Sequence, residues 1–145
     1  QEWQREFNLI FHNIRRTSLA VVPDMIRHRW GRIISITGHL ESNGRLSGAL
    51  ASKAAVHGFS KGLSGEVARQ GVTVNCISPG KIMSEQVRGK YDEQRFKKTA
   101  EQIPMGRFGE PEELARLAVF LASPLSSYIT GTVMHVDGGF RRYAF

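Results

Sequence analysis

The sequence predicts an α/β protein built on a parallel β-sheet. Three short apolar segments, at 32–37, 72–78 and 130–139, are typical of strands that are buried on both faces. Longer segments with apolar residues at helical spacing precede and separate them. Strands that alternate with helices pair in parallel, because the helix carries the chain back to the start of the next strand. A three-stranded sheet leaves one edge unpaired, so we expect something else to complete it.

One long helix is expected over residues 3–29. Pro23 lacks the amide hydrogen that continues a helix, so we expect a kink or a division there. Residues 38–46, after the first strand, are polar, contain glycine and predict a loop. The apolar stripe of the helix consists of Phe7, Ile10, Phe11, Ile14, Leu19, Val22, Met25 and Ile26.

A second helix is expected over residues 47–69. Gly71 suits the left-handed residue that ends a helix. The strand at 72–78 then ends at Pro79 and Gly80, a pair that breaks regular structure. The stripe expected to be buried consists of Ala51, Ala55, Phe59, Leu63 and Val67, at four-residue spacing.

The last third of the chain contains a polar segment, a helix and the final strand. Residues 84–101 are charged and weakly amphipathic, so we expect a mobile segment of helix and loop. Residues 109–123 predict a helix with Pro111 near its first turn and acidic residues at its positive end. The strand at 130–139 ends in a glycine turn.

Composition limits the class of protein. A chain of 145 residues suffices for one domain, and 41% hydrophobic with 23% charged residues is typical of a globular protein. No apolar run approaches the roughly 18 residues of a membrane span, and no signal peptide is visible. The single cysteine, Cys76, cannot form an internal disulfide and suits a reducing compartment. We therefore expect a cytoplasmic protein without membrane contact.

The chain is strongly basic, with a formal net charge of +7 and a pI of about 10.1. Its basic residues are scattered over helix faces and ends and form no compact patch that would bind nucleic acid. A basic chain instead favours an acidic protein partner. The scattered residues are Arg15, Arg16, Arg27, Arg29, Arg32, Lys97, Lys98, Arg141 and Arg142.

Five stretches of sequence carry a family resemblance. They are GRIISIT, ASKAAVHGFSKGL, VTVNCISPGKIMS, IPMGRFGEPEELARLAVFLAS and SSYITGTVMHVDGG. In this order and at this spacing, over residues 3–139, the chain resembles the C-terminal half of a short-chain dehydrogenase/reductase (SDR). The resemblance implies a Rossmann-type parallel sheet with flanking helices. It also implies that residues 1–145 form a single partial domain, without the N-terminal half whose glycine-rich turn binds the cofactor's pyrophosphate.

The resemblance implies NAD(P)-dependent hydride transfer to or from a carbonyl or alcohol carbon. In the family, a tyrosine exchanges a proton with the substrate oxygen. A lysine four residues later lowers the pKa of that tyrosine and holds the ribose. A serine after the preceding strand holds the substrate oxygen, and an asparagine on an earlier helix supports the lysine through water.

This sequence keeps the lysine and departs from the family at the other three positions. Lys53 matches the lysine, but Ala49 stands at the tyrosine position and has no exchangeable proton. Gly38 falls at the serine position and Ile10 at the asparagine position. Thr37, one residue earlier in a strand, would face the other way. We expect the family's proton relay to be lost and Lys53 to have another polar partner or a path to solvent.

The loop on the nicotinamide side is better preserved. Pro79, Gly80, Ile82 and Ser84 match the family loop that contacts the nicotinamide carboxamide. Together with Lys53 they are the candidate NAD(P)-binding residues. The alternative is that the Pro-Gly pair only ends a strand and that this chain binds no cofactor. No metal site is predicted.

His39 is the candidate replacement for the tyrosine. It lies beside Gly38, and an imidazole titrates near neutral pH, so it could act as acid or base. Tyr91, in the segment that covers the substrate in the family, is another candidate. Neither residue has a partner at a diagnostic spacing.

Two functions remain open. The first is a non-catalytic SDR subunit, a pseudoenzyme, that assembles with itself or with a competent SDR. Its contacts would be the helices at 3–29 and 47–69 and the C-terminal strand and tail. The second is an active SDR-type enzyme with altered chemistry and a replacement acid or base such as His39. Dinucleotide binding distinguishes them, because a dehydrogenase requires it and a structural subunit does not.

Overall fold

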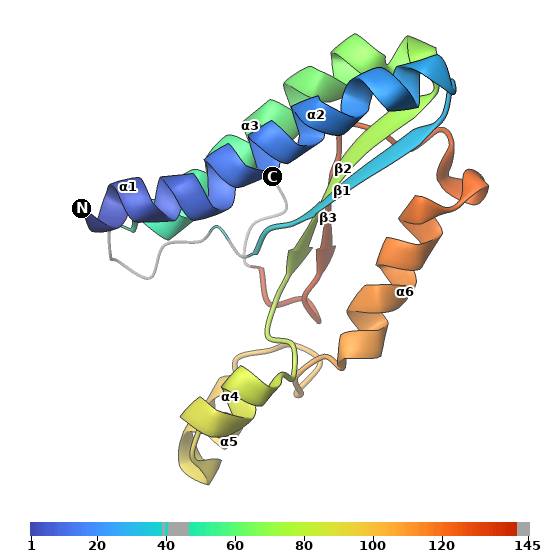
Figure 1. The fold of residues 1–145 in the computed structure, drawn as a ribbon. Helices are drawn as coiled ribbons and strands as arrows, with labels where there is room; N and C mark the ends of the chain where they lie inside the picture. Colours follow the sequence, from blue (N-terminus) through green and yellow to red (C-terminus); the bar gives the residue numbers. More distant parts are fainter. Residues whose placement is uncertain (39, 41–46, 142–145) are drawn as a thin grey trace.

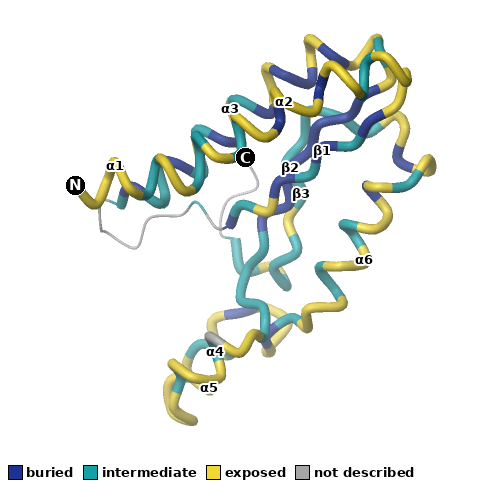
Figure 2. Tube along the Cα trace, in the orientation of Figure 1, coloured by how far each residue is buried: buried dark blue, intermediate teal, exposed yellow. Residues whose placement is uncertain are grey.

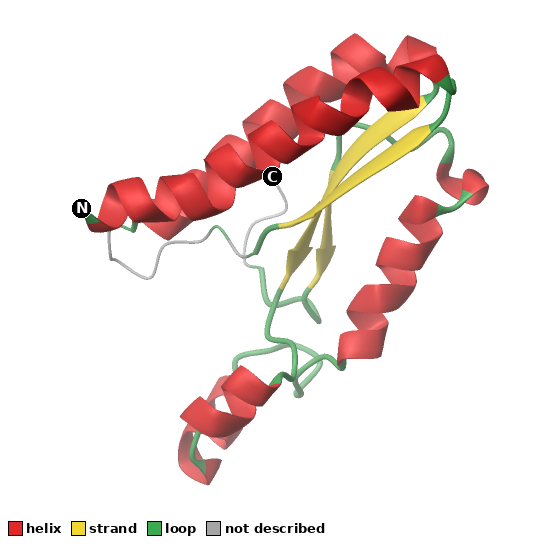
Figure 3. Ribbon diagram, viewed as in Figure 1, coloured by secondary structure: helices red, strands yellow, loops and turns green. Residues whose placement is uncertain are grey.

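A computed structural model describes residues 1–38, 40 and 47–141. Its strands form one parallel sheet with β2 in the centre. The expected α/β class and the three expected strands are confirmed, with helices on both faces of the sheet (Figure 3). The strands are β1 (Gly31–Ile36), β2 (Val72–Pro79) and β3 (Val133–Val136).

Different helices cover the two faces of the sheet (Figure 1). On one face, α2 (Asn13–Arg27) packs against β1 and α3 (Gly48–Val67) packs against β2. On the other face, α6 (Pro111–Ala122) packs against β1 and β2. None of the helices in the described part of the chain is long and apolar enough to cross a membrane.

The N-terminal helix continues through Pro23. It consists of α1 (Glu2–Phe7), a π-helical turn (Asn8–His12) and α2, all with helical backbone angles at their junctions. The expected division at Pro23 is therefore wrong, because this exposed proline lies inside a continuous α2. The irregular turn lies instead at 8–12, where the helix packs on α3. Such a turn is a single widened helical turn and is often found near functional sites.

The face of α3 that is most buried carries small polar residues as well as aliphatic ones. The expected residues Ala51, Ala55 and Phe59 are only half-buried, whereas Leu63 and Val67 are buried as expected. The buried hydroxyls enter the core with hydrogen bonds, which removes most of the cost of burying them. Ser52 Oγ, for example, donates to the Gly48 carbonyl at 2.7 Å. The residues of α3 that are fully buried are Gly48, Ser52, Val56, Ser60, Leu63, Ser64 and Val67.

The core lies between the sheet and the helices α2 and α3. Val56, Val72 and Val74 have no exposed surface. Burying a side chain of this size contributes about 1.5–3 kcal/mol to folding. Figure 2 shows the buried positions gathered on β1, β2 and the side of α3 that faces them. This core fixes the ends of β1 and β2, and therefore the residues that follow them.

Two short helices extend beyond the carboxyl end of β2, as Figure 1 shows: α4 (Glu85–Lys90) and α5 (Glu93–Ala100). They confirm the expected helices and loops of this segment. Phe96 on α5 stacks on Phe108 with ring centroids 4.4 Å apart. The two helices are thereby attached to the loop that leads into α6.

The start of α6 is fixed to the preceding loop, and the helix expected over 109–123 is confirmed. Pro111 occupies its first turn, and Glu110 and Glu113 form a capping box. The Arg107 guanidinium donates two hydrogen bonds, of 2.7 and 2.8 Å, to the Glu113 carboxylate. These bonds lower the pKa of Glu113 to about 2.

Candidate functional site

The candidate site lies at the carboxyl edge of the sheet. Gly38 follows β1, Gly80 follows β2 and Asp137 follows β3. In open parallel α/β sheets, ligands bind outside the carboxyl ends of the strands. The backbone and side chains around these three residues therefore decide what this edge can bind.

Lys53 reaches this edge from α3. Its side chain is half-buried, and a Cβ placed on Gly38 would lie 2.9 Å from Lys53 Nζ. Gly38 has a φ of +143°, a conformation that residues with a side chain rarely adopt. The ammonium group therefore lies directly against the backbone at position 38, in the space that a side chain there would need.

A histidine that the sequence analysis did not select lies beside Lys53. His57 is one turn further along α3, and its Nε2 is 2.8 Å from Thr37 Oγ1. Position 38 and Thr37 both face α3, because Gly38 leaves strand geometry directly after β1. The expectation that Thr37 faces the other way is therefore wrong.

The surroundings of His57 favour its neutral form. Burial lowers the pKa of His57, and the electrostatic influence of His135 and of the Arg141 guanidinium lowers it further. His135 lies on β3, and an Arg141 N–H donates to its Nε2. At neutral pH, His57 is therefore an imidazole that can accept a proton.

Ser78 joins the end of β2 to the same place. Its buried hydroxyl donates to the Gly38 carbonyl at 2.9 Å. The strand register puts Ser78 beside His135 on one side, and Thr37 follows the pair Ile36↔Ile77 on the other. Thr37, Ser78 and His135 therefore form a polar row across the sheet on the face that α3 covers.

The loop expected to meet the nicotinamide is fixed by β3. Gly80 N donates to the Val136 carbonyl at 2.9 Å, and a Cβ on Gly80 would lie 2.6 Å from Asp137 Cα. A larger residue at position 80 would collide with the backbone at Asp137, so the contact with the end of β3 by itself requires glycine there. Pro79 is the last residue of β2.

The remaining loop residues also have structural contacts. Ile82 forms an isolated parallel bridge with Gly109. Ser84 Oγ caps α4 by accepting a hydrogen bond from Val87 N at 3.2 Å. The side chain of Ser84 is thus already used, and backbone groups of the loop remain for a ligand.

These groups fit part of a nicotinamide nucleotide. A lysine ammonium suits ribose hydroxyls, and backbone amide and carbonyl groups suit a carboxamide. The cofactor, when bound, supplies or accepts a hydride. The sequence holds no G-x-G-x-x-G turn, so these residues do not include a site for the pyrophosphate.

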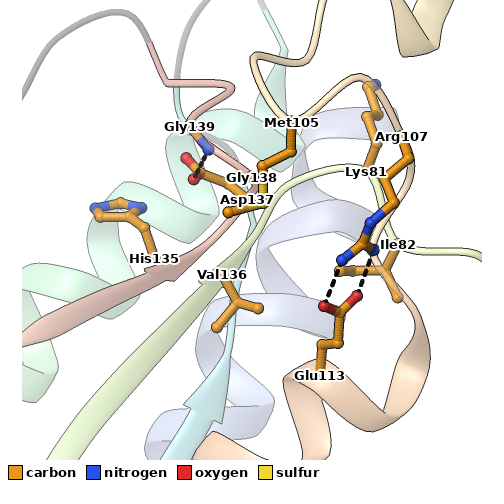
Figure 4. A pocket seen from close by; sticks show the side chains of 11 residues that line it. Lys81, Ile82, Met105, Arg107, Glu113, His135, Val136, Asp137, Gly138 and Gly139 are labelled. Carbon is orange, nitrogen blue, oxygen red and sulfur yellow. Dashed lines mark hydrogen bonds and ion pairs between the residues drawn. The ribbon is translucent and has the colours of Figure 1, made fainter.

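A pocket of about 340 Å³ opens beside the loop (Figure 4). Ile82, Met105 and Val136 contribute apolar surface to it, and its charged groups have partners of their own. Arg107 binds Glu113, and the Asp137 carboxylate accepts backbone N–H groups at 2.9 and 3.2 Å. Neither Lys53 nor His57 lines this pocket, so it is distinct from the place where those two residues meet β1.

Comparison with known proteins identifies the family. The family model described as "Enoyl-(Acyl carrier protein) reductase" matches residues 1–141. The chain belongs to the short-chain dehydrogenase/reductase family. The 3-oxoacyl-[acyl-carrier-protein] reductase FabG of Vibrio cholerae is 43% identical over 142 residues, which are 96% of this chain and 57% of that protein. FabG of Escherichia coli is 41% identical with the same coverage, so the chain spans just over half the length of these relatives.

Solved structures agree with this SDR assignment. A putative NAD(P) dependent gluconate 5-dehydrogenase from Beutenbergia cavernae, with bound NADP at low occupancy, is 34% identical with a TM-score of 0.87. The match covers 95% of this chain and 57% of that one. The TT0495 protein of Thermus thermophilus is 31% identical with a TM-score of 0.89 and covers 98% of this chain and 62% of that one. The Rossmann-type sheet that the resemblance implied is thereby confirmed.

Of the residues expected for the SDR relay, Lys53 alone carries a group that can hold or exchange a proton. Ala49 is half-buried one turn before Lys53 on α3. Ile10 is half-buried in the π-helical turn. Asn8 and Asn13, its neighbours in sequence, are both exposed.

Of the two suggested replacements for the tyrosine, the structure describes only Tyr91. His39 lies outside the described residues. The Tyr91 ring packs edge-on against Phe108, with centroids 5.9 Å apart, and the Arg95 guanidinium lies over it. Tyr91 therefore belongs to the aromatic cluster under α4 and α5. Within the described ranges, no three His, Cys, Asp or Glu side chains form a group that could hold a metal ion.

Proposed function

We propose that this chain is an SDR oxidoreductase subunit that does not transfer hydride through the tyrosine relay, and that it serves as a non-catalytic subunit of an oligomer. The observation that carries this proposal is Ala49, one turn before Lys53, where the relay needs a phenol. A methyl group neither gives nor takes a proton. General acid–base catalysis contributes about 10²–10⁴-fold to a rate. A site without its acid is therefore expected to fall short of its relatives by at least that factor.

The position of Lys53 supports the same proposal. In the relay, a lysine lowers the pKa of the neighbouring phenol by its positive charge. Here the ammonium lies against Gly38, where the family's serine side chain would be. At both of these relay positions the smaller residue, Ala49 or Gly38, lacks the hydroxyl group that the relay's contacts need.

NAD(P) is the proposed cofactor class. Support comes from the SDR family itself and from the gluconate 5-dehydrogenase neighbour, whose structure holds NADP. The FabG relatives are named for reduction of 3-oxoacyl groups on acyl carrier protein, which makes a 3-oxoacyl thioester the substrate class to test. Binding would use Lys53 and the backbone of the loop that contains Pro79, Gly80, Ile82 and Ser84.

The proposed oligomer contacts are the long helices and the C-terminal strand and tail. Trp3, Leu9 and Leu19 expose 44%, 62% and 44% of their surface on the N-terminal helix, which favours a contact that covers them. The partner is a second copy or a competent SDR subunit, and the charge of +7 favours an acidic one. The free, buried Cys76 suits the reducing environment of the cytoplasm, where we place this assembly.

The test is calorimetry with NADH and NADPH on the full-length protein, alone and with any SDR that co-purifies, together with a reductase assay on an acetoacetyl thioester. We expect no hydride transfer by this subunit, and cofactor binding in the partner. A matched pair of variants, Ala49→Tyr and Ala54→Tyr on the same helix, shows whether a phenol at the relay position matters. Thioester reduction by the unmodified protein at a rate comparable with a FabG would contradict the proposal.

A second candidate function is an active SDR-type enzyme with a replacement acid or base. His39 was the residue suggested by the sequence, and its place lies outside the described structure. The specific observation that favours this candidate is the contact between His57 and Thr37, directly beside Lys53 and Gly38.

A further inference from the structure

Helix α3 presents two nitrogen-bearing side chains to the end of β1. Lys53 meets Gly38, and His57, one turn later, meets Thr37. Gly38 and Thr37 are adjacent in sequence, so the Lys53 ammonium and the His57 imidazole contact neighbouring residues of one short segment. That segment lies at the carboxyl edge where ligands of such sheets bind.

We propose that Thr37 and His57 form a proton-transfer pair that takes the place of the missing tyrosine. Thr37 Oγ1 would contact the substrate oxygen, and His57 would act as the base through Thr37. This inference rests on the second candidate function above and replaces His39 as its acid–base group.

Thr37 has a hydrogen-bond partner for each charge state of His57. Its Oγ1 lies 2.8 Å from His57 Nε2 and 3.3 Å from the Ile77 carbonyl oxygen. When neutral His57 carries its proton on Nδ1, the Thr37 hydroxyl donates to Nε2. When His57 is protonated, Nε2–H donates to Thr37 and the hydroxyl turns to the carbonyl. Both states are therefore satisfied without movement of the backbone, which is what a repeated proton transfer requires.

The charged and titratable groups around His57 keep it in its neutral form. Lys53 stands one turn before it on α3, His135 faces it from β3, and Arg141 follows β3. Thr37, on β1, is uncharged. Added positive charge in such surroundings is unfavourable, so His57 is neutral at neutral pH and ready to accept a proton.

A neutral base suits the oxidation of an alcohol. The alcohol gives its hydroxyl proton to Thr37 Oγ1 while Thr37 passes its own proton to His57 Nε2. An oxidised nicotinamide, when bound, would accept the hydride released as the C–H bond of the alcohol breaks. The products are a ketone, a reduced nicotinamide and an imidazolium that returns its proton to solvent.

Lys53 would stabilise the negative charge that develops on the substrate oxygen. Its ammonium lies against Gly38, next to the threonine that contacts the same oxygen. Because glycine stands at position 38 in place of the family's serine, no side chain there separates the Lys53 ammonium from the substrate oxygen. In this proposal, Lys53 and His57 of α3, together with Thr37 after β1, compensate for the loss of the tyrosine and of the serine.

The test uses the full-length protein with NAD or NADP and the 3-hydroxybutyryl thioester of N-acetylcysteamine as the alcohol. We expect His57→Gln and Thr37→Val to lower kcat at least about 100-fold. Thr37→Ser, which keeps the hydroxyl, should restore most of the rate, and His28→Gln, an exposed histidine at the far end of α2, should have no effect.

The pH profile and NMR separate a proton-transfer role from a structural one. The rate of the unmodified protein should fall below a pKa lower than about 6.5, the ordinary value of histidine, and stay level toward alkaline pH. Long-range ¹H–¹⁵N spectra should show an unprotonated Nε2 on neutral His57, and Thr37→Val should change its pKa even without cofactor.

Each result separates this inference from the proposed function. Cofactor binding without alcohol oxidation overturns the inference and leaves the non-catalytic subunit standing. Oxidation that survives His57→Gln with the same pH profile overturns the inference and the non-catalytic proposal together. A protonated Nε2 on neutral His57 also overturns it, because that nitrogen could not accept the proton of Thr37.

Discussion

Glycine at position 38 is required by its neighbours. Its φ of +143° is strained for other residues, and a Cβ there would lie 2.9 Å from Lys53 Nζ. The carbonyl of the same residue accepts a hydrogen bond from buried Ser78, which prevents the segment from shifting. A side chain at this position therefore has to move the lysine and also adopt an unfavourable backbone conformation.

We predict that Gly38→Ser lowers the free energy of unfolding by about 1–3 kcal/mol, the usual cost of a side chain at such a backbone conformation. Gly65→Ser on α3 is the matched control, because no atom lies within 4 Å of a Cβ placed there. That control should raise stability by a few tenths of a kcal/mol, since serine is a better helix former than glycine. Urea unfolding of the three proteins measures both effects, and equal values for the two variants would contradict the argument.

The sequence predicted half of this site. Lys53, Ala49 and Gly38 were placed by motif spacing, which is a local property of the chain. His57 was missed although it lies four residues after Lys53, because a lone histidine on a helix has no local partner. Its partner, Thr37, lies 20 residues away and is brought to it only by the packing of α3 on the sheet. Contacts of this kind depend on the tertiary structure and leave no spacing signal.

At the scale of whole elements, buried strands were predicted well and irregularities were not. The apolar runs gave β1 and β2 within one residue at each end. Pro23 was expected to kink or divide a helix, yet α2, which packs on α3 and β1, continues through it. On α3, residue hydrophobicity indicated Ala51 and Ala55, whereas the sheet lies closer to Ser52 and Val56. The serines of α3 that hydrogen-bond to their own helix backbone can be buried, but residue type alone does not distinguish them from serines at the surface.

The start of α6 gives a pH-dependent prediction at this scale. The Arg107 hydrogen bonds lower the pKa of Glu113 from its ordinary 4.5 to about 2. A lowered pKa means that the ionised carboxylate stabilises the fold, fully above pH 4.5 and less as the pH falls toward 2. Glu113→Gln should therefore be less stable than the unmodified protein at pH 7, and the difference should shrink below pH 4.5.

Thermal unfolding across this pH range measures the effect. Glu112→Gln is the control, because Glu112 is exposed in the same turn and the Arg107 guanidinium bonds to Glu113 instead. Salt should weaken the contribution of Glu113, since the pair is at the surface. A stability difference that is independent of pH would show that the ion pair does not carry it.

At the scale of the whole molecule, the sheet has an open side. A groove of about 440 Å³ runs between α2 and β1, lined by Ile14, Val21 and Ile33 among others. Ile36, at the end of β1, exposes 48% of its surface. The FabG relatives that the chain matches are longer, and it covers 57% of their length. An apolar groove beside a free strand edge favours a further strand that pairs with β1.

Amide exchange tests this arrangement residue by residue. Thr37 N donates to the Ile77 carbonyl, so alternation along β1 points the amides of Ile33 and Ser35 toward β2 and those of Ile34 and Ile36 toward the free edge. In the 145-residue chain we predict slow exchange at Ile33 and Ser35 and fast exchange at Ile34 and Ile36. In the full-length protein all four should exchange slowly, because a neighbouring strand binds the outer pair. Fast exchange at Ile34 and Ile36 in both forms would mean that the edge stays open, and slow exchange in both would mean that a second copy already covers it.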